Sequence, residues 1–202
     1  MEKWLNAIFP PKCVFCNEFG YVFCDLCLGK CRPLNKTFCI GDLSVYCCFE
    51  YEGLVRKCVK KAKYSSRQFA ALKVLVKRGI CTAKVPSRFV VMPIPLSKEK
   101  VKARGFNQAH IIACILSEKL ELPYQNSNLI RIKDTKAQYT LGRKRRMDNL
   151  KGAFQVMGDV SSLSVLLVDD VCTSGATFLE ASRVLYAAGV KEVRCFALSK
   201  KL

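Results

Sequence analysis

Two adjacent carboxylates and a turn of small residues lie close together near the end of this chain. Asp169 and Asp170 follow an apolar run at 165–168, and two residues later comes a loop at 173–177: Thr173, Ser174, Gly175, Ala176 and Thr177. Small side chains let successive backbone N–H groups point to one side, and a following helix adds partial positive charge. The pattern predicts a phosphate cradle beside a site for hydroxyls or a metal ion. The alternative is a capped helix start without a ligand, because Thr and Ser are good N-caps.

The elements that would hold these residues follow from the apolar pattern. The uninterrupted run at 165–168 is typical of a parallel strand that is covered on both faces. Another apolar strand at 89–92 continues into a loop at 93–97: Pro93, Ile94, Pro95, Leu96 and Ser97. Ligands of open α/β sheets bind at the carboxyl ends of the strands, where both loops would lie. With further strands expected near 128, 153 and 193, the sequence predicts an α/β fold: a mostly parallel sheet flanked by helices.

Thirteen cysteines in a chain with no obvious secretory signal indicate metal ligands or free thiols before disulfides. Four of them form two C-x-x-C pairs that are separated by seven residues: Cys13 and Cys16, then Cys24 and Cys27. Each pair can give two thiolates to one tetrahedral Zn²⁺, which closes the coordination shell and makes the site structural. A thioredoxin-like redox pair would need a βαβ setting that this part of the chain does not show. Cys31 and Cys39 lie nearby, and the sequence alone leaves open whether either replaces a ligand.

The net charge of +18 is concentrated in the middle of the chain. Residues 51–157 hold 24 basic and six acidic residues, whereas each flanking region holds five of either sign. Two helices are expected within residues 52–76, the first with a basic outer face at 56–63. Such a centre suggests a polyanionic partner, either nucleic acid or a phosphorylated small molecule, although a solvated basic surface competes with that interpretation. His110, the only histidine, has no evident partner, and we assign it no catalytic role.

Three motifs together carry a resemblance to a known family. They are Pro93-x-Pro95-Leu-Ser97, the segment Arg104-Gly-Phe-Asn-Gln-Ala109, and the acidic pair with its small-residue loop, behind the cysteine pairs. The last motif resembles the phosphoribosyl-pyrophosphate (PRPP) signature of type I phosphoribosyltransferases. The whole arrangement resembles the ComF family, phosphoribosyltransferase-like proteins linked to bacterial competence for DNA uptake. The similarity extends from Cys13 to about Leu198; Cys172 stands at a usually aliphatic position, and Ser174 replaces a common threonine.

The resemblance implies a role for each part of the site. The 173–177 loop would hold the 5′-phosphate of PRPP, and Asp169 and Asp170 would bind the ribose hydroxyls directly or through Mg²⁺. The 93–97 loop and Arg104 would hold the pyrophosphate. A basic segment at 135–146 would close over the substrate and exclude water. Asp169, Asp170 and Arg104 are the residues expected to act in catalysis.

Two functions remain open on the sequence, since no stretch indicates a base-recognition hood. The first is a PRPP-dependent phosphoribosyltransferase with an unidentified acceptor. The second is a non-catalytic protein that binds single-stranded DNA during natural transformation, together with other competence proteins. We expect a cytoplasmic protein without a membrane span, with a helix and zinc-binding module at 1–42 and the phosphoribosyltransferase-like domain at 43–202.

Overall fold

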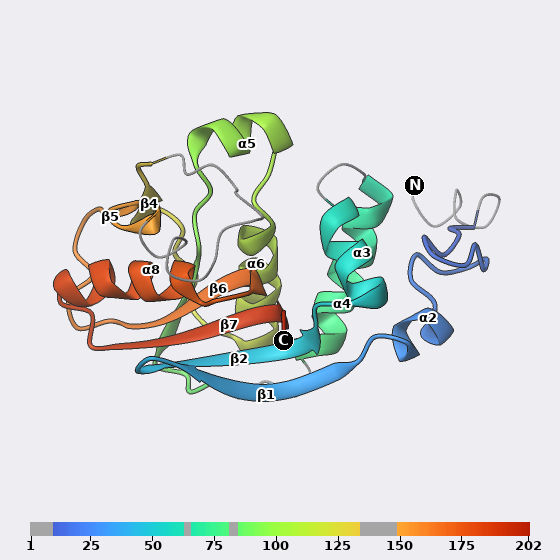
Figure 1. Ribbon diagram of the computed structural model, residues 1–202, viewed down its shortest axis with the longest axis horizontal. Coiled ribbons are helices and arrows are strands. Elements are labelled where there is room, and N and C mark those ends of the chain that lie inside the picture. Colours follow the sequence, from blue (N-terminus) through green and yellow to red (C-terminus); the bar gives the residue numbers. More distant parts are fainter. Residues whose placement is uncertain (1–9, 63–65, 81–84, 134–148) are drawn as a thin grey trace.

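The computed structural model describes residues 10–62, 66–80, 85–133 and 149–202. Its main sheet has five strands in the order β1-β2-β7-β6-β3 (Figure 1). The strands are β1 (Pro33–Ile40), β2 (Leu43–Glu50), β3 (Phe89–Pro93), β6 (Ser164–Cys172) and β7 (Glu192–Lys200). β1 and β2 form an antiparallel hairpin, and the other three neighbouring pairs are parallel. The expected mostly parallel sheet is therefore confirmed.

Helices cover both faces of this sheet, as the uninterrupted apolar strands require. The helices are α2 (Asp25–Gly29), α3 (Gly53–Lys61), α4 (Ser66–Ile80), α5 (Lys98–Arg104), α6 (Gln108–Leu120) and α8 (Ala176–Ala187). Along β6, Val165 and Leu167 pack into the core beside α8, whereas Leu166 and Val168 pack into the core with α4 and α6. This alternation is the period of two of a strand that is buried on both sides.

Two expected strands do not belong to the main sheet. β4 (Leu129–Arg131) and β5 (Phe154–Val156) pair with each other, antiparallel, in a separate two-stranded sheet. The chain runs beside the edge strand β3 only briefly: Val91 N donates to Pro123 O at 2.8 Å, and Gln125 N donates to Val91 O at 3.0 Å. It then leaves the edge, so the segments near 128 and 153 satisfy their backbone groups with each other.

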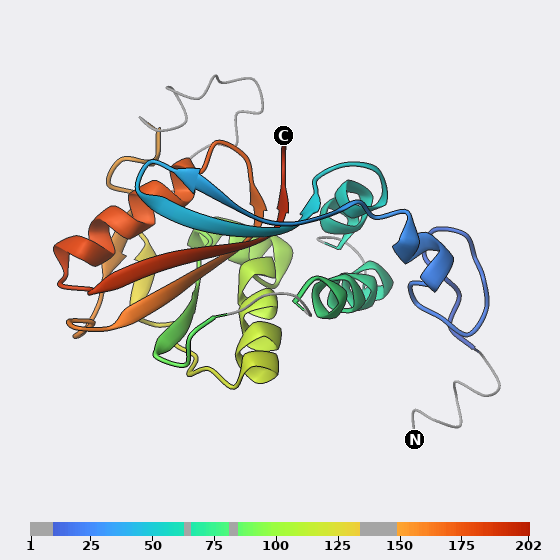
Figure 2. The same ribbon diagram turned by 90° about the horizontal axis from the view of Figure 1, so that it is seen from below.

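The N-terminal part of the chain reaches further into the fold than the sequence indicated. β1 precedes the expected domain boundary at 42/43, yet it is the edge strand of the main sheet and pairs with β2 from Ile40↔Leu43 onward. Only Ile40 of this strand is buried, and Lys36 interrupts the apolar alternation of Leu34, Phe38 and Ile40, so the strand was not predicted. The cysteine pairs and α2 lie before β1, at the end of the molecule beyond α3 and α4 in both views (Figures 1 and 2). Buried cysteines of this part pack into the same core as α3 and α4.

The expected helices on the basic segment are confirmed. In α3, Val55, Cys58 and Val59 are buried, while the basic residues of its outer face are exposed: Arg56, Lys57, Lys60 and Lys61. In α4, Leu72, Leu75 and Val76 are fully buried. Two other expectations, a short helix near residue 4 and the closing segment at 135–146, lie outside the described residues.

Candidate functional site

The two predicted loops meet at one edge of the sheet. β3 and β6 are parallel neighbours with Pro93 opposite Val168, so the 93–97 loop and the acidic pair follow side by side. Ile94 N continues the ladder by donating to Val168 O at 2.8 Å. The carboxyl ends of adjacent parallel strands open a crevice in α/β folds, which is where ligands bind. The tertiary structure therefore brings together two motifs that are about 75 residues apart in the sequence.

Asp169 and Asp170 lie near the end of β6, and both are half-buried. Burial, together with the neighbouring Asp170 charge, raises the pKa of Asp169 well above its usual range. Asp169 Oδ1 accepts a hydrogen bond from the backbone N of Asp170 at 2.8 Å, which offsets part of that effect. A cation or a hydroxyl donor at this place would relieve the repulsion.

The 173–177 loop turns sharply from β6 into α8. Gly175 has φ +79°, in the left-handed region, and a Cβ built on it would lie 2.6 Å from both Cδ1 and Cγ2 of Ile40 in β1. A side chain at this position would thus be strained and would clash, which explains why the loop needs glycine here. β1, which the sequence did not reveal as a strand, forms the wall against which the loop packs.

The backbone amides of this loop donate to no group in the described residues. In the part of the chain that the structure describes, none of the N–H groups from residue 173 to residue 178 donates a hydrogen bond. Amides at the start of α8 have no intrahelical acceptor, and those of the preceding turn add to them. Consecutive N–H groups of this kind form a concave donor surface that suits a phosphate.

The 93–97 loop is fixed from the other side by the second motif. Asn107 caps α6 by accepting from Ala109 N at 3.1 Å, and its Nδ2 donates to Ile94 O at 2.9 Å. Buried Gln108 donates from Nε2 to Val59 O at 2.8 Å, which ties α6 to α3. The Asn-Gln pair of the motif therefore positions the loop and the helix. Asparagine is a preferred N-cap residue, so the sequence could indicate that Asn107 begins a helix. It could not indicate the hydrogen bond from Asn107 to Ile94.

Arg104 is less closely associated with the acidic pair than the loops are. The basic segment 98–104 is the helix α5. Buried Ser97 caps its start, because the Ser97 hydroxyl accepts a hydrogen bond from Lys100 N at 3.4 Å. Arg104 is the last residue of α5 and is half-exposed. Among the described residues, no hydrogen bond or ion pair joins Arg104 to Asp169 or Asp170.

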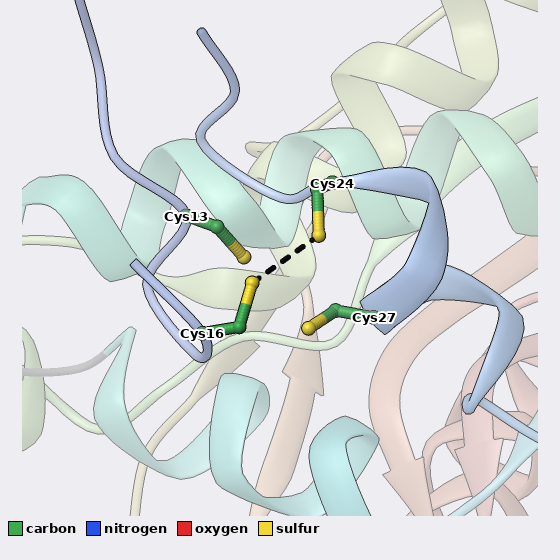
Figure 3. Close-up of side chains that lie close together, drawn as sticks. All are labelled: Cys13, Cys16, Cys24 and Cys27. Atoms are coloured by element: carbon green, nitrogen blue, oxygen red, sulfur yellow. Dashed lines mark hydrogen bonds between the residues drawn. The ribbon is translucent and has the colours of Figure 1, made fainter. Parts of the chain in front are cut away.

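The four predicted cysteine ligands form a single cluster (Figure 3). The sulfur atoms of Cys13, Cys16, Cys24 and Cys27 all lie within 4.8 Å of one another, and Cys16 Sγ is 3.4 Å from Cys24 Sγ. Four thiolates at about 2.3 Å from one tetrahedral Zn²⁺ would be separated by about 3.8 Å. The arrangement therefore fits such an ion.

The cluster also stabilises a negative charge on sulfur. Burial opposes ionisation of Cys13, but backbone hydrogen bonds, of which that from Cys24 is the strongest, outweigh it and lower the pKa of Cys13 to about 6. Burial and the neighbouring cysteines raise the pKa of Cys27 to about 12, because a second thiolate beside the first is unfavourable without a cation. Cys31 lies outside the cluster and donates to Cys27 O at 3.7 Å, and Cys39 is exposed on β1. Neither replaces a member of the cluster.

His110 has partners that the sequence did not show. Its Nδ1 is hydrogen-bonded to the hydroxyl of Tyr124, and its Nε2 lies 3.7 Å from Cys114 Sγ, one turn along α6. Burial, followed by Cys114, raises the pKa of Tyr124. The histidine therefore joins α6 to the segment around Tyr124, which runs beside β3. The sequence did not indicate this contact.

Comparison with known proteins identifies the family. A model described as the phosphoribosyl transferase domain matches residues 100–202, just over half of the chain. The chain belongs to the phosphoribosyltransferase family. Its acidic pair and its 173–177 loop lie within the matched residues, and the observed sheet with its flanking helices is the type I phosphoribosyltransferase fold.

The relatives of this phosphoribosyltransferase-family chain confirm the resemblance to ComF proteins. It is 27% identical over 200 residues to the DNA utilization protein YhgH of Escherichia coli strain K12, covering 95% of this chain and 84% of that protein. It is 36% identical over 113 residues to competence protein F of Haemophilus influenzae, covering 54% and 49%. It is also 36% identical over 104 residues to competence protein ComFC of Bacillus subtilis, covering 50% and 40%.

Among solved structures, similarity is found to a purine phosphoribosyltransferase from Pyrococcus horikoshii, with TM-score 0.36, 17% identity and coverage of 71% of this chain and 73% of that one. A hypoxanthine phosphoribosyltransferase from Staphylococcus aureus gives TM-score 0.41, 12% identity and coverage of 65% and 64%. In the part of the chain that the structure describes, no helix has the length and apolar character needed to cross a bilayer.

Proposed function

We propose that this chain binds PRPP at the carboxyl edge of β3 and β6 and transfers its phosphoribosyl group to an acceptor. The observation that carries this proposal is the row of amides from 173 to 178. They have no acceptor among the described residues, and two residues separate them from a pair of carboxylates. Those amides would hold the 5′-phosphate. The family match supports the assignment, because it includes both the acids and the loop.

The carboxylates would hold the ribose. Asp169 and Asp170 would accept hydrogen bonds from its 2′- and 3′-hydroxyls, which would offset the burial and the repulsion that together raise the pKa of Asp169 in the protein alone. Mg²⁺, which prefers carboxylate and phosphate oxygens, would neutralise charge on the pyrophosphate when it is bound. On the other side of the crevice, the 93–97 loop and Arg104 would hold the pyrophosphate.

In the proposed reaction, a nitrogen nucleophile forms a bond to C1 of the ribose as the bond from C1 to the pyrophosphate oxygen breaks. The pyrophosphate leaves with the electron pair, and the nucleophile loses its proton to solvent. Donors already aimed at the leaving phosphates would stabilise the charge that develops on them. Such chemistry depends on positioning more than on a covalent intermediate, so it needs no Ser–His or Cys–His arrangement.

Calorimetric titration of PRPP with Mg²⁺ tests the site. We expect binding to the wild type and a loss of at least about 100-fold in affinity for Asp169→Asn/Asp170→Asn, since two ligand-contacting groups are removed. Glu118→Gln/Glu121→Gln, which removes two exposed carboxylates at the end of α6, is the control and should bind normally. Equal affinity of the acidic-pair variant and the wild type would refute the assignment. Pyrophosphate release that depends on an added acceptor would support transfer over binding alone.

The second candidate function, binding of single-stranded DNA, is favoured by the surface of α3 and α4. The two helices pack against each other, neither contains an acidic residue, and each exposes several basic side chains. The exposed residues are Arg56, Lys57, Lys60, Lys61, Lys73, Lys77 and Arg78. A row of cations on neighbouring helices can follow a phosphate backbone.

Salt dependence tests this surface. For Lys57→Gln/Lys60→Gln/Lys61→Gln we expect weaker binding of an oligonucleotide and a slope of log K against log salt that is shallower by about 0.7 per lost phosphate contact. The control, Lys30→Gln/Lys119→Gln/Lys191→Gln, removes the same charge from exposed positions elsewhere. Equal slopes for both variants would show that net charge, and not this surface, is responsible.

We propose further that the cysteine cluster holds one structural Zn²⁺. The four sulfur atoms converge, and backbone hydrogen bonds to Cys13 already favour a thiolate. When bound, the ion would contribute directly to the folding free energy of residues 13–27. Metal analysis of the purified protein should find about one zinc per chain, and a folded protein without metal would contradict this proposal.

A further inference from the structure

The 173–177 loop and the residues before it accept hydrogen bonds from the end of β7. Lys200 Nζ donates to Thr173 O at 3.0 Å, and Ser199 Oγ donates to Asp170 O at 3.1 Å. The backbone N of Lys201 donates to Cys172 O at 3.0 Å. The carbonyls of Asp170, Cys172 and Thr173 are therefore occupied, whereas the amides from 173 to 178 donate to nothing in the described part of the chain.

The occupied carbonyls of Cys172 and Thr173 fix the direction of the first two of those amides, at Thr173 and Ser174. The C=O of Thr173 and the N–H of Ser174 belong to one planar peptide unit, and all described peptide bonds are trans. In a trans unit the two groups point in opposite directions, so an ammonium that holds Thr173 O also aims the Ser174 amide. The same geometry lets the bond from Lys201 N to Cys172 O aim the Thr173 amide.

Lys200 is itself well held in place. Its backbone belongs to β7, where it is opposite Cys172, and its carbonyl accepts from Tyr51 N at 2.8 Å. The ammonium lies 5.5 Å from the ring centroid of Phe38 in β1, a distance at which a cation is attracted to an aromatic face. Ser199 is completely buried. The donors at the end of β7 are thus ordered by the sheet and do not depend on the loop that they contact.

We propose that Lys200 is a positioning residue for the 173–177 loop, assisted by Ser199, and that it aims the loop amides at the ligand phosphate without contacting the ligand. This inference rests on the proposed PRPP site and adds a residue to it. Without Lys200, the carbonyl of Thr173 loses the ammonium that holds it and hydrogen-bonds to water. The peptide unit between residues 173 and 174 can then rotate. The amide donors would no longer converge before the ligand arrives, and the ordering cost would be subtracted from the binding free energy.

Titration of PRPP with Mg²⁺ into Lys200→Met tests the proposal. We expect about a tenfold loss of affinity, typical of one lost charge-assisted hydrogen bond, while Lys200→Arg, which keeps a donor of similar reach, should recover most of it. Lys191→Met removes the same charge from the exposed residue just before β7 and should bind as the wild type does. Ser199→Ala should show a smaller loss.

The dependence on salt separates positioning from simple attraction of the ligand by charge. If Lys200 acts on the backbone, the affinity ratio of wild type to Lys200→Met should be the same at low and at high salt, because the short hydrogen bond is screened little. A ratio that falls to one at high salt would overturn the proposal, and so would equal affinities at all salt concentrations.

If the wild type itself fails to bind PRPP, the proposed function fails. In that case ¹⁵N relaxation still tests Lys200, since Lys200→Met should lower the backbone order parameters of residues 173 and 174, and unchanged values would refute the positioning role.

Discussion

The carboxyl edge of the sheet and the cysteine cluster differ in how they satisfy their reactive groups. In the cluster, all four sulfur atoms face one another within 4.8 Å, so an ion placed among them would have no open position. At the sheet edge, the amides from 173 to 178 donate to no described group, and the carboxylates of Asp169 and Asp170 do not accept from them. The first arrangement is suited to holding a structure together, and the second is suited to binding and releasing a ligand.

The two regions also differ in how they destabilise the protein when no ligand or metal is bound. Burial, together with the like charge of Asp170, raises the pKa of Asp169, and a left-handed glycine is held against Ile40. These features are unfavourable without a ligand, as is common where binding sites are prepared in advance. In the cluster, the raised pKa of Cys27 means that a second thiolate is likewise unfavourable, but a permanently bound cation would offset this repulsion.

Removal of the proposed zinc should have the largest effect and would sharpen this contrast. For Cys13→Ser/Cys27→Ser we expect local unfolding of residues 13–27, because metal binding to such sites contributes on the order of 10 kcal/mol. Limited proteolysis and metal analysis would detect it. The sheet-edge site should still bind PRPP, since none of its described hydrogen bonds comes from this module. Loss of PRPP affinity without unfolding would show that the two regions are coupled.

Gly175→Ala should have an intermediate effect, confined to the sheet edge. The left-handed backbone costs about 1–2 kcal/mol for alanine, and the contact with Ile40 adds to it, so we expect a lower melting temperature and weaker PRPP binding. Gly29→Ala is the control, because its Cβ would meet nothing within 4 Å and its φ is not positive. Adding Ile40→Val to Gly175→Ala should recover part of the stability. No recovery would mean that backbone strain alone is responsible.

Asp169→Asn should have the smallest effect, and in the opposite direction. The folded-state pKa of Asp169 is raised, so its ionised form destabilises the folded protein at pH values above that pKa. The amide should therefore stabilise the ligand-free protein at neutral pH by about 1 kcal/mol. This gain should shrink as the pH falls through the folded pKa toward the unfolded one, because wild-type Asp169 then becomes neutral as well. Thermal melts at pH 7 and pH 4 measure it, and destabilisation at pH 7 would contradict the assignment.

The sequence by itself determined the local chemistry and the type of fold. The apolar run at 165–168 predicted a strand of a parallel sheet that is covered on both faces. The spacing of Cys13, Cys16, Cys24 and Cys27 selected four cysteines that do converge. These features are local: each depends on residue type and on short spacing, which a chain shows directly.

Only the tertiary structure decided what surrounds those motifs. β1 is mostly exposed, and Lys36 interrupts the alternation of Leu34, Phe38 and Ile40, so it was not predicted as a strand, although its Ile40 forms the wall behind Gly175. The segments near 128 and 153 have the composition of sheet strands, but their partners were chosen by where the chain passed β3. The contact of Lys200 with Thr173 depends on the register between β6 and β7. Pairing between distant segments is set by global packing, and residue types alone do not encode it locally.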